Sequence, residues 1–345
     1  MYGIIINMTG NQIQHLVLYR KYRPETFDDV VGQEQLVELL TSSIKQKKIS
    51  HAYLFCGSRG TGKTTVARIF ARDIGCNPED IIEIDAASNR GIDEIRELRE
   101  AVRTSPFSSP YKVYIIDEAH MLTKDAANAL LKTLEEPPSH VVFILATTDP
   151  DKLPQTIVSR CQKIVFKQPE LVVLRDRLIY VANKEGKKLT EESGELLARH
   201  GKGSYRDALG ILEQVIALSK KEIDHSDVVN LLGTPNKDLL INLLESVCTK
   251  DSKEILSISK KLEDANGVAI RTYDELVELV RCALLSRIGE TKNESKEIVR
   301  IGKEHAFFIN SKLILTLLEK RHLLEVSDNH AWTALVSILL SITEE

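Results

Sequence analysis

Short apolar runs separated by stretches of helical periodicity fill the first half of the chain. Five runs have the length of a strand buried on both faces: 51–56, 81–84, 113–116, 141–146 and 163–166. Apolar residues between them recur at helical spacing, as at Leu36, Leu39 and Leu40. Alternating buried strands and helices predict a largely parallel sheet with helices on both faces, and therefore an α/β domain over 17–168.

Beyond Pro169 the pattern predicts helices and no further strands. Two breaks interrupt the helical periodicity, Gly-Lys-Gly at 201–203 and Gly-Thr-Pro at 233–235, and the segment after the second break is rich in Leu and Ile. We therefore expect a small helical domain at 169–234 and an all-helical domain at 235–345. Residues 1–16 lack a clear period and predict a loosely held tail, with either Met1 or Met8 as the start.

Composition and charge narrow the function classes. The 345 residues are 43% hydrophobic and 28% charged, which is enough to bury cores in two or three domains. The net charge of −4 excludes a generally basic nucleic-acid coat, so DNA contacts would have to be local. The sequence shows neither a signal peptide nor a membrane span, and its five cysteines lack C-x-x-C spacing. We expect a cytoplasmic protein with reduced cysteines and no zinc.

A phosphate-binding loop lies between the first predicted strand and a predicted helix. It consists of Gly57, Ser58, Arg59, Gly60, Thr61, Gly62, Lys63 and Thr64, and Thr65 begins the helix. Glycines let successive N–H groups point at phosphate oxygens, Lys63 places a cation beside the β- and γ-phosphates, and the Thr64 hydroxyl can ligate Mg²⁺.

The run 113–116 ends in two carboxylates, Asp117 and Glu118. One carboxylate can hold the metal and its water, and the next can polarise an attacking water. A glycine-rich turn alone is weak evidence, but the pair of motifs predicts that the chain binds and hydrolyses a nucleoside triphosphate.

Arg206 occupies an unusual position in the helical region. Ser204 and Asp207 resemble an N-cap and its reciprocal partner, so Arg206 should lie in the first turn of a helix. A cation there is unfavourable unless an anion is close.

Several motifs in the same order resemble the gamma/tau subunits of the bacterial DNA polymerase III clamp loader, which are AAA+ ATPases. The resemblance covers 19 to about 232 and rests on YRKYRP at 19–24, VVGQ at 30–33, the phosphate-binding loop, EIDAASNRG at 83–91, DEAH at 117–120, LATTDP at 145–150, SRC at 159–161 and GSYRDAL at 203–209.

The resemblance implies a role for each matching residue. ATP and Mg²⁺ would be bound, with Thr64 and Asp117 at the metal and Glu118 as the base. Thr148 would orient the attacking water, Arg206 would touch the γ-phosphate, and Arg160 would act in trans as an arginine finger. The segment 19–24 would surround the adenine together with Val30 and Val31, and its binding residues would be Tyr19, Arg20, Arg23 and Pro24. An isolated arginine such as Arg160 would by default be a surface ion-pair residue, and its SRC setting reverses that default.

The resemblance also implies an architecture: an AAA+ core at 17–168, a helical lid at 169–234 and a helical collar at 235–345. Such a subunit would assemble, as a pentamer, with delta and delta-prime type subunits within the DNA polymerase holoenzyme. It would bind a sliding clamp and primer-template DNA, with Asn89 and Arg90 as candidate DNA contacts. A loader must accept any sequence, so these contacts should be to phosphates.

One departure from the family pattern concerns zinc. Gamma/tau subunits usually carry a four-cysteine zinc module after the helix of the phosphate-binding loop, whereas the interval 71–84 holds only Cys76. In this respect the core resembles the zinc-free small subunits of replication factor C.

The sequence leaves two other classes of protein open. Another AAA+ DNA motor, such as a branch-migration helicase, would share the fold. A non-hydrolysing structural arm of a clamp loader would keep the SRC motif but commonly has a damaged phosphate-binding loop, and the intact Lys63, Asp117 and Glu118 argue against it.

Overall fold

The structure is a computed structural model that describes residues 17–218, 222–233, 235–265, 267–289, 295–326 and 330–344. The predicted tail at 1–16 lies outside them. Contacts within the chain divide it into two compact units, Met1–Asp224 and His225–Glu345, which are described in turn. The finer division into core, lid and collar stays a prediction.

A five-stranded parallel sheet forms the centre of the first unit, in the order β2-β3-β4-β1-β5. The strands are β1 (Ala52–Cys56), β2 (Ile81–Asp85), β3 (Lys112–Asp117), β4 (Val141–Thr147) and β5 (Gln162–Val165). Each coincides with a predicted strand to within one residue, which confirms the predicted α/β fold. In β1, β3 and β4 nearly every residue is buried, as expected for strands covered on both faces.

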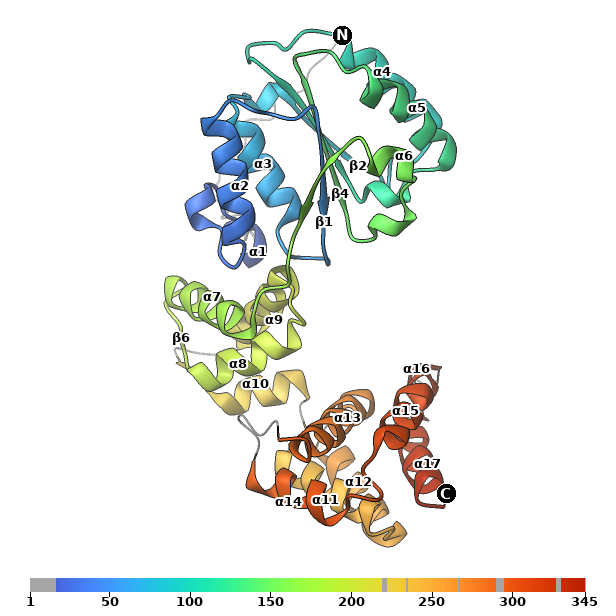
Figure 1. Ribbon diagram of the computed structural model, residues 1–345. Coiled ribbons are helices and arrows are strands. Elements are labelled where there is room, and N and C mark those ends of the chain that lie inside the picture. Colours follow the sequence, from blue (N-terminus) through green and yellow to red (C-terminus); the bar gives the residue numbers. More distant parts are fainter. Residues whose placement is uncertain are drawn as a thin grey trace, which may run out of the picture. The chain divides into compact units, whose positions relative to one another are not determined.

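Helices cover both faces of this sheet (Figure 1). One face packs under α2 (Glu34–Lys45) and α3 (Lys63–Asp73), and the other under α4 (Ile92–Val102), α5 (Lys124–Glu135) and α6 (Gln155–Val158). Side chains of β1 alternate between the two cores, with Tyr53 and Phe55 in the first and Leu54 in the second. Shorter elements complete this part: α1 (Leu18–Lys21) and the 3₁₀ turns Phe27–Asp29, Pro78–Asp80, Ala119–Met121 and Pro150–Lys152.

A buried carboxylate orders the segment where the zinc module would lie. Asp80 accepts hydrogen bonds from the N–H groups of Phe107 and Ser108 at 2.6 and 3.0 Å. Burial raises the pKa of Asp80, but these donors and Ser109 outweigh it, so the pKa is lowered overall. Cys76 is buried nearby and its thiol donates to the carbonyl of Tyr111.

The segment after the sheet is mainly helical but also contains two short strands. Its helices are α7 (Leu171–Lys184), α8 (Glu191–His200) and α9 (Tyr205–Leu218). Strands β6 (Lys188–Leu189) and β7 (Glu222–Ile223) pair in parallel. The prediction that strands stop at Pro169 was therefore wrong, because a two-residue strand leaves no period in the sequence.

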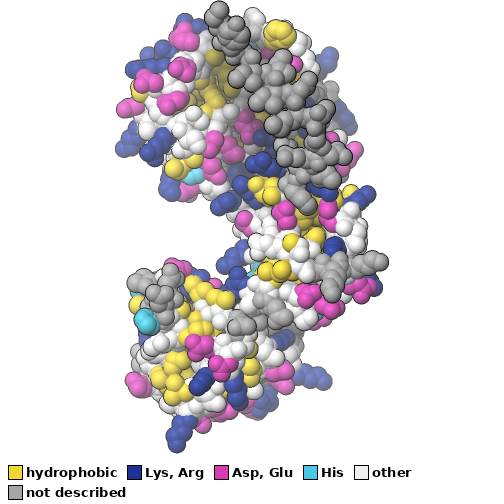
Figure 2. All heavy atoms as spheres, turned by 180° about the vertical axis from the view of Figure 1, so that it is seen from behind, with side chains coloured by type: hydrophobic (Ala, Val, Ile, Leu, Met, Phe, Trp, Pro, Cys, Tyr) yellow, Lys and Arg dark blue, Asp and Glu magenta, His cyan; other side chains and the backbone are white. Residues whose placement is uncertain are grey.

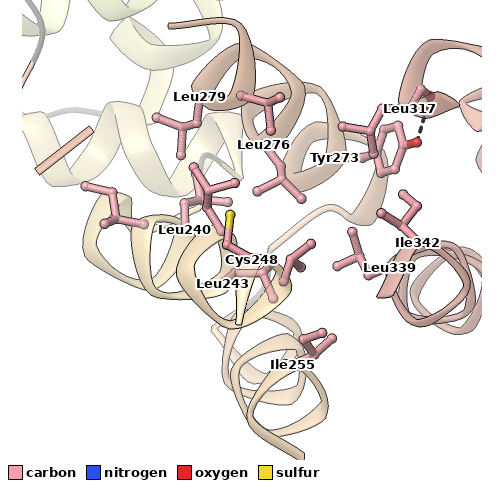
Figure 3. Packing of buried hydrophobic residues seen from close by; sticks show 14 of the residues in the cluster. Leu240, Leu243, Cys248, Ile255, Tyr273, Leu276, Leu279, Leu317, Leu339 and Ile342 are labelled. Carbon is pink, nitrogen blue, oxygen red and sulfur yellow. Dashed lines mark hydrogen bonds between the residues drawn. The ribbon is translucent and has the colours of Figure 1, made fainter. Parts of the chain in front are cut away.

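The second unit is helical throughout its described residues. It comprises α10 (His225–Leu232), α11 (Lys237–Cys248), α12 (Ser252–Asp264), α13 (Ala269–Ser286), α14 (Lys296–Glu304), α15 (Ser311–Lys320), α16 (His322–Val326) and α17 (Ala331–Glu344). Polar side chains cap several helix starts, such as Asn236 on α11 and Asp251 on α12. Figure 3 shows apolar side chains of α11, α12, α13 and α17 meeting in one core, where the buried Tyr273 hydroxyl donates to the Leu317 carbonyl at 2.7 Å.

Surface charge is mixed in sign. On the face seen in Figure 2, Lys and Arg side chains are interspersed with Asp and Glu over both units. Among the described residues, no helix is long and apolar enough to cross a membrane.

Candidate nucleotide-binding site

Three neighbouring strands bring the predicted chemistry to one edge of the sheet. Strand β1 leads into the phosphate-binding loop, β3 ends at Asp117, and β4, which lies between them, ends at Thr147. The carboxyl ends of parallel strands lie at the same edge, where α/β proteins bind ligands.

Lys63, the first residue of α3, points back into the loop that precedes it. Its ammonium group donates to the carbonyls of Gly57 and Ser58 at 2.8 and 2.9 Å, and the residue is only 6% exposed. Burial lowers the pKa of Lys63, while the carboxylates of Glu118 and Asp117 oppose that shift. Gly62, with φ of 101°, supplies the left-handed turn that starts α3 beneath this loop.

Two oxygen ligands of the kind that Mg²⁺ prefers lie beside the lysine. The Thr64 hydroxyl donates to Asp117 Oδ2 at 2.6 Å, which joins the helix start to the end of β3. A hydroxyl and a carboxylate that converge in this way fit a magnesium ion that keeps waters and substrate phosphates as its other ligands.

Residues just beyond the ends of β3 and β4 hold Glu118. Its backbone is left-handed, with φ of 49°, which is a strained conformation for a residue with a side chain. Glu118 Oε2 accepts from the Thr148 hydroxyl at 3.2 Å and lies 3.5 Å from His120 Nδ1. That same ring nitrogen lies 3.0 Å from the hydroxyl oxygen of the buried Thr147. The carboxylate is therefore oriented by the end of β4.

The first turn of α9 packs directly on the phosphate-binding loop. The Tyr205 N–H donates to the Gly60 carbonyl at 3.0 Å, and the Tyr205 hydroxyl donates to the Val31 carbonyl at 2.9 Å. Gly60 has a φ of 75°, and a Cβ on it would lie 1.9 Å from the Ser204 hydroxyl oxygen. Ser204 Oγ accepts from the Asp207 N–H, as the predicted N-cap requires.

Arg206 lies in that first turn, over the ring of Tyr19. Its guanidinium carbon is 4.9 Å from the ring centroid, a cation–π distance. Tyr19 is thus shared between the predicted adenine segment and the helix that carries Arg206.

Most of the predicted binding residues line one cavity. Those present are Tyr19, Arg23, Pro24, Val30, Val31, Arg59, Gly60, Thr61, Gly62, Lys63, Thr64, Thr65, Asp117, Glu118 and Arg206. The cavity is polar beside the loop and more apolar beside Pro24, Val30 and Val31, as a nucleotide with phosphates and a base requires.

Other predicted residues lie around this cavity rather than on its wall. Gly57 and Ser58 contribute through their bonds to Lys63, and Thr148 through Glu118. Arg20 lines an adjoining cavity together with Arg23.

The cavity wall does not include the predicted DNA contacts Asn89 and Arg90 or the predicted arginine finger Arg160. Asn89 and Arg90 are exposed in the turn after β2, where the Asn89 side chain donates to the Asp85 carbonyl. Arg160 follows α6 and pairs with Glu135 at 2.6 Å.

The cavity also contains Tyr22, from the predicted adenine segment 19–24, and residues that sequence reasoning missed, namely Asp29, Val66, Arg177, Tyr205 and Leu209. Tyr205 is next to Arg206 in the GSYRDAL motif and could have been chosen from that position. Arg177 gives no such signal, since it occupies an ordinary polar position of α7; it donates to the Tyr22 carbonyl at 2.8 Å.

Solved structures share the fold of part of this chain. The Holliday junction branch migration motor RuvB of Thermotoga maritima matches with a TM-score of 0.53 at 19% identity, over 66% of this chain and 79% of that one. At that identity the likeness concerns the fold alone.

Family comparisons are more specific. A model described as DNA polymerase III, delta subunit matches residues 32–91 and 77–170, and the ATPase lid domain of the DNA polymerase III clamp loader subunit matches 173–221. The chain is 40% identical to DNA polymerase III subunit tau of Bacillus subtilis over 84% of this chain and 55% of that protein. It is 38% identical to subunit tau of Escherichia coli over 80% of this chain and 46% of that protein. The chain thus spans about half the length of these two tau relatives.

A shorter relative is matched almost end to end. Subunit gamma of Buchnera aphidicola subsp. Schizaphis graminum is 34% identical over 96% of this chain and 99% of that protein. With its phosphate-binding loop, paired carboxylates and lid in place, the chain belongs to the family of DNA polymerase III gamma/tau subunits.

Proposed function

We propose that this chain is the ATP-hydrolysing subunit of a DNA polymerase III clamp loader, which places a sliding clamp on primed DNA. The observation that carries the proposal is the convergence of Lys63, Thr64, Asp117, Glu118 and Arg206 in one cavity of a gamma/tau family chain. Family membership favours this function over a branch-migration motor, whose likeness is limited to the fold. The intact loop and carboxylates favour it over a structural arm.

The chain's own residues would share the work on ATP. Lys63 would exchange its loop carbonyls for the β- and γ-phosphates, and Arg206 would leave Tyr19 for the γ-phosphate. Thr64 and Asp117 would hold Mg²⁺, which when bound supplies charge neutralisation of the phosphates. Glu118, oriented by Thr148, would accept the proton of the attacking water.

The adenine would lie at the apolar end of the cavity. Pro24, Val30 and Val31 offer apolar contacts there, and Tyr19 offers an aromatic face. Arg23 lies between this end and the adjoining cavity that also contains Arg20, so these two arginines would surround the base from the outside.

Assembly and DNA contacts belong to the same proposal. Arg160 would complete the site of a neighbouring subunit in a pentamer with delta and delta-prime type subunits, joined through the helical collar. Asn89 and Arg90, exposed after β2, would contact DNA phosphates. ATP would stabilise the form that holds the clamp open through its higher affinity for that form, and hydrolysis would release the clamp.

Replacing Lys63 by alanine tests the nucleotide site. We expect affinity for ATP to fall about 10- to 100-fold, because charge-assisted hydrogen bonds to phosphate are lost. Titration with a fluorescent ATP analogue measures this, and Lys48→Ala, an exposed lysine of the same unit, is the control. Unchanged affinity in Lys63→Ala would contradict the assignment of the loop.

The clamp-loading role is tested by the hydrolysis rate with and without the cognate clamp and primed DNA. We expect the assembled complex to hydrolyse ATP faster when both are present, because they bind the form that is competent for hydrolysis. If unprimed duplex without a clamp raised the hydrolysis rate as much as clamp and primed DNA together, the chain would belong to a different DNA motor.

A further inference from the structure

A carboxylate of the same chain holds the side chain of Arg160. Arg160 Nη2 lies 2.6 Å from Glu135 Oε1, and Nη1 donates to the Thr156 carbonyl at 2.8 Å. Nη1 also lies 3.4 Å from the Ser159 hydroxyl oxygen. About a third of the Arg160 side chain stays exposed. The guanidinium is thus fixed along one edge and remains accessible.

Both partners of this pair project from well-anchored backbone. Glu135 is the last residue of α5 and follows Leu134, which is 1% exposed in the core. Arg160 follows α6, whose Ile157 is fully buried in the same core. The ion pair therefore joins two elements whose own positions are set by packing.

We propose that Glu135 is a positioning residue for the ATPase reaction: it fixes Arg160 in the orientation that enters the site of a neighbouring subunit. This inference rests on the proposed role of Arg160 in trans. Glu135 itself would touch neither ATP nor the reacting atoms.

The physical reason is the flexibility of arginine. A free arginine side chain loses conformational entropy when it is ordered. Without prior ordering, this entropy cost would raise the free energy of the step that brings the guanidinium to the phosphate. The pair with Glu135 and the bond to the Thr156 carbonyl order it beforehand, while the guanidinium keeps further N–H donors for phosphate oxygens. An exposed ion pair contributes little to stability, so replacing Glu135 should change the orientation of Arg160 without unfolding the chain.

Glu136 is a matched control. It is the next residue, carries the same side chain and is exposed like Glu135, and no ion pair connects it to another of the described residues. Any effect of general charge loss at the end of α5 should therefore be seen equally in Glu136→Ala.

The test is the ATPase rate of the assembled complex with clamp and primed DNA. We expect Glu135→Ala to lower kcat about tenfold with little change in KM. The kcat of Glu135→Gln should lie between that of Glu135→Ala and that of the unchanged chain, because the amide oxygen still accepts from the guanidinium. Glu136→Ala should leave the rate unchanged. Thermal unfolding of each variant checks that the fold is kept.

A double-mutant cycle shows whether Glu135 acts through Arg160. If it does, Glu135→Ala added to Arg160→Ala causes no further loss. A full second loss of rate in the double variant would overturn the positioning role. So would a rate of Glu135→Ala that equals that of Glu136→Ala or exceeds that of the unchanged chain. The proposed function would stay in place in each of these cases. No loss in Arg160→Ala itself would overturn both the trans role of Arg160 and this inference.

Discussion

Arg160→Ala should reduce the clamp- and DNA-stimulated ATPase rate of the assembled complex by on the order of 10³-fold or more, the range typical of arginine fingers. The nucleotide affinity of the isolated chain should stay nearly unchanged, because Arg160 lies away from its own cavity and pairs with Glu135. Steady-state phosphate release from the complex and nucleotide titration of the isolated chain measure the two quantities.

Mixing variants separates action in trans from a structural role. Complexes that contain both Arg160→Ala and Lys63→Ala chains should regain activity at interfaces where an intact Lys63 faces an intact Arg160. Such rescue requires two chains. If Arg160→Ala harmed the isolated chain as severely as the complex and mixing restored nothing, the arginine would act within its own subunit.

Glu118→Gln should lower kcat by about 10²- to 10⁴-fold while ATP and clamp still bind. The amide keeps the size of the side chain and can still accept from Thr148, but it is a poor base. The variant should therefore stall in the ATP-bound form with the clamp held. Single-turnover phosphate release measures the step.

The control for this variant is Glu136→Gln, the same change at an exposed position, which should turn over normally. A Glu118→Gln complex that retained its turnover within a few-fold would show that another residue positions the water.

Buried regular elements were the most predictable part of the molecule. Strands β1, β3 and β4 are continuous apolar runs because both faces of the sheet are covered, and each run ends where the structure ends the strand to within one residue. The loop and the paired carboxylates follow directly from these strand ends, so their proximity could be predicted.

Side-chain contacts between distant segments could not be predicted. Nothing in the sequence connects Glu135 with Arg160, or Tyr19 with Arg206, because each pair depends on tertiary packing. Strands β6 and β7 escaped prediction for another reason, since a pairing of two residues is too short to leave a period. Arg20 matched the family motif, yet it lines the adjoining cavity and not the nucleotide cavity, whereas Arg23 lines both.

The contact between α9 and the phosphate-binding loop has a kinetic consequence. For the lid to swing away from the core, the bond from the Tyr205 N–H to the Gly60 carbonyl must break, and Ser204 must leave the surface of Gly60. Arg206 moves with the same turn. We therefore expect a nucleotide to leave after this turn has moved, so that the residence time of ADP follows the opening rate of α9 rather than the strength of any one phosphate contact.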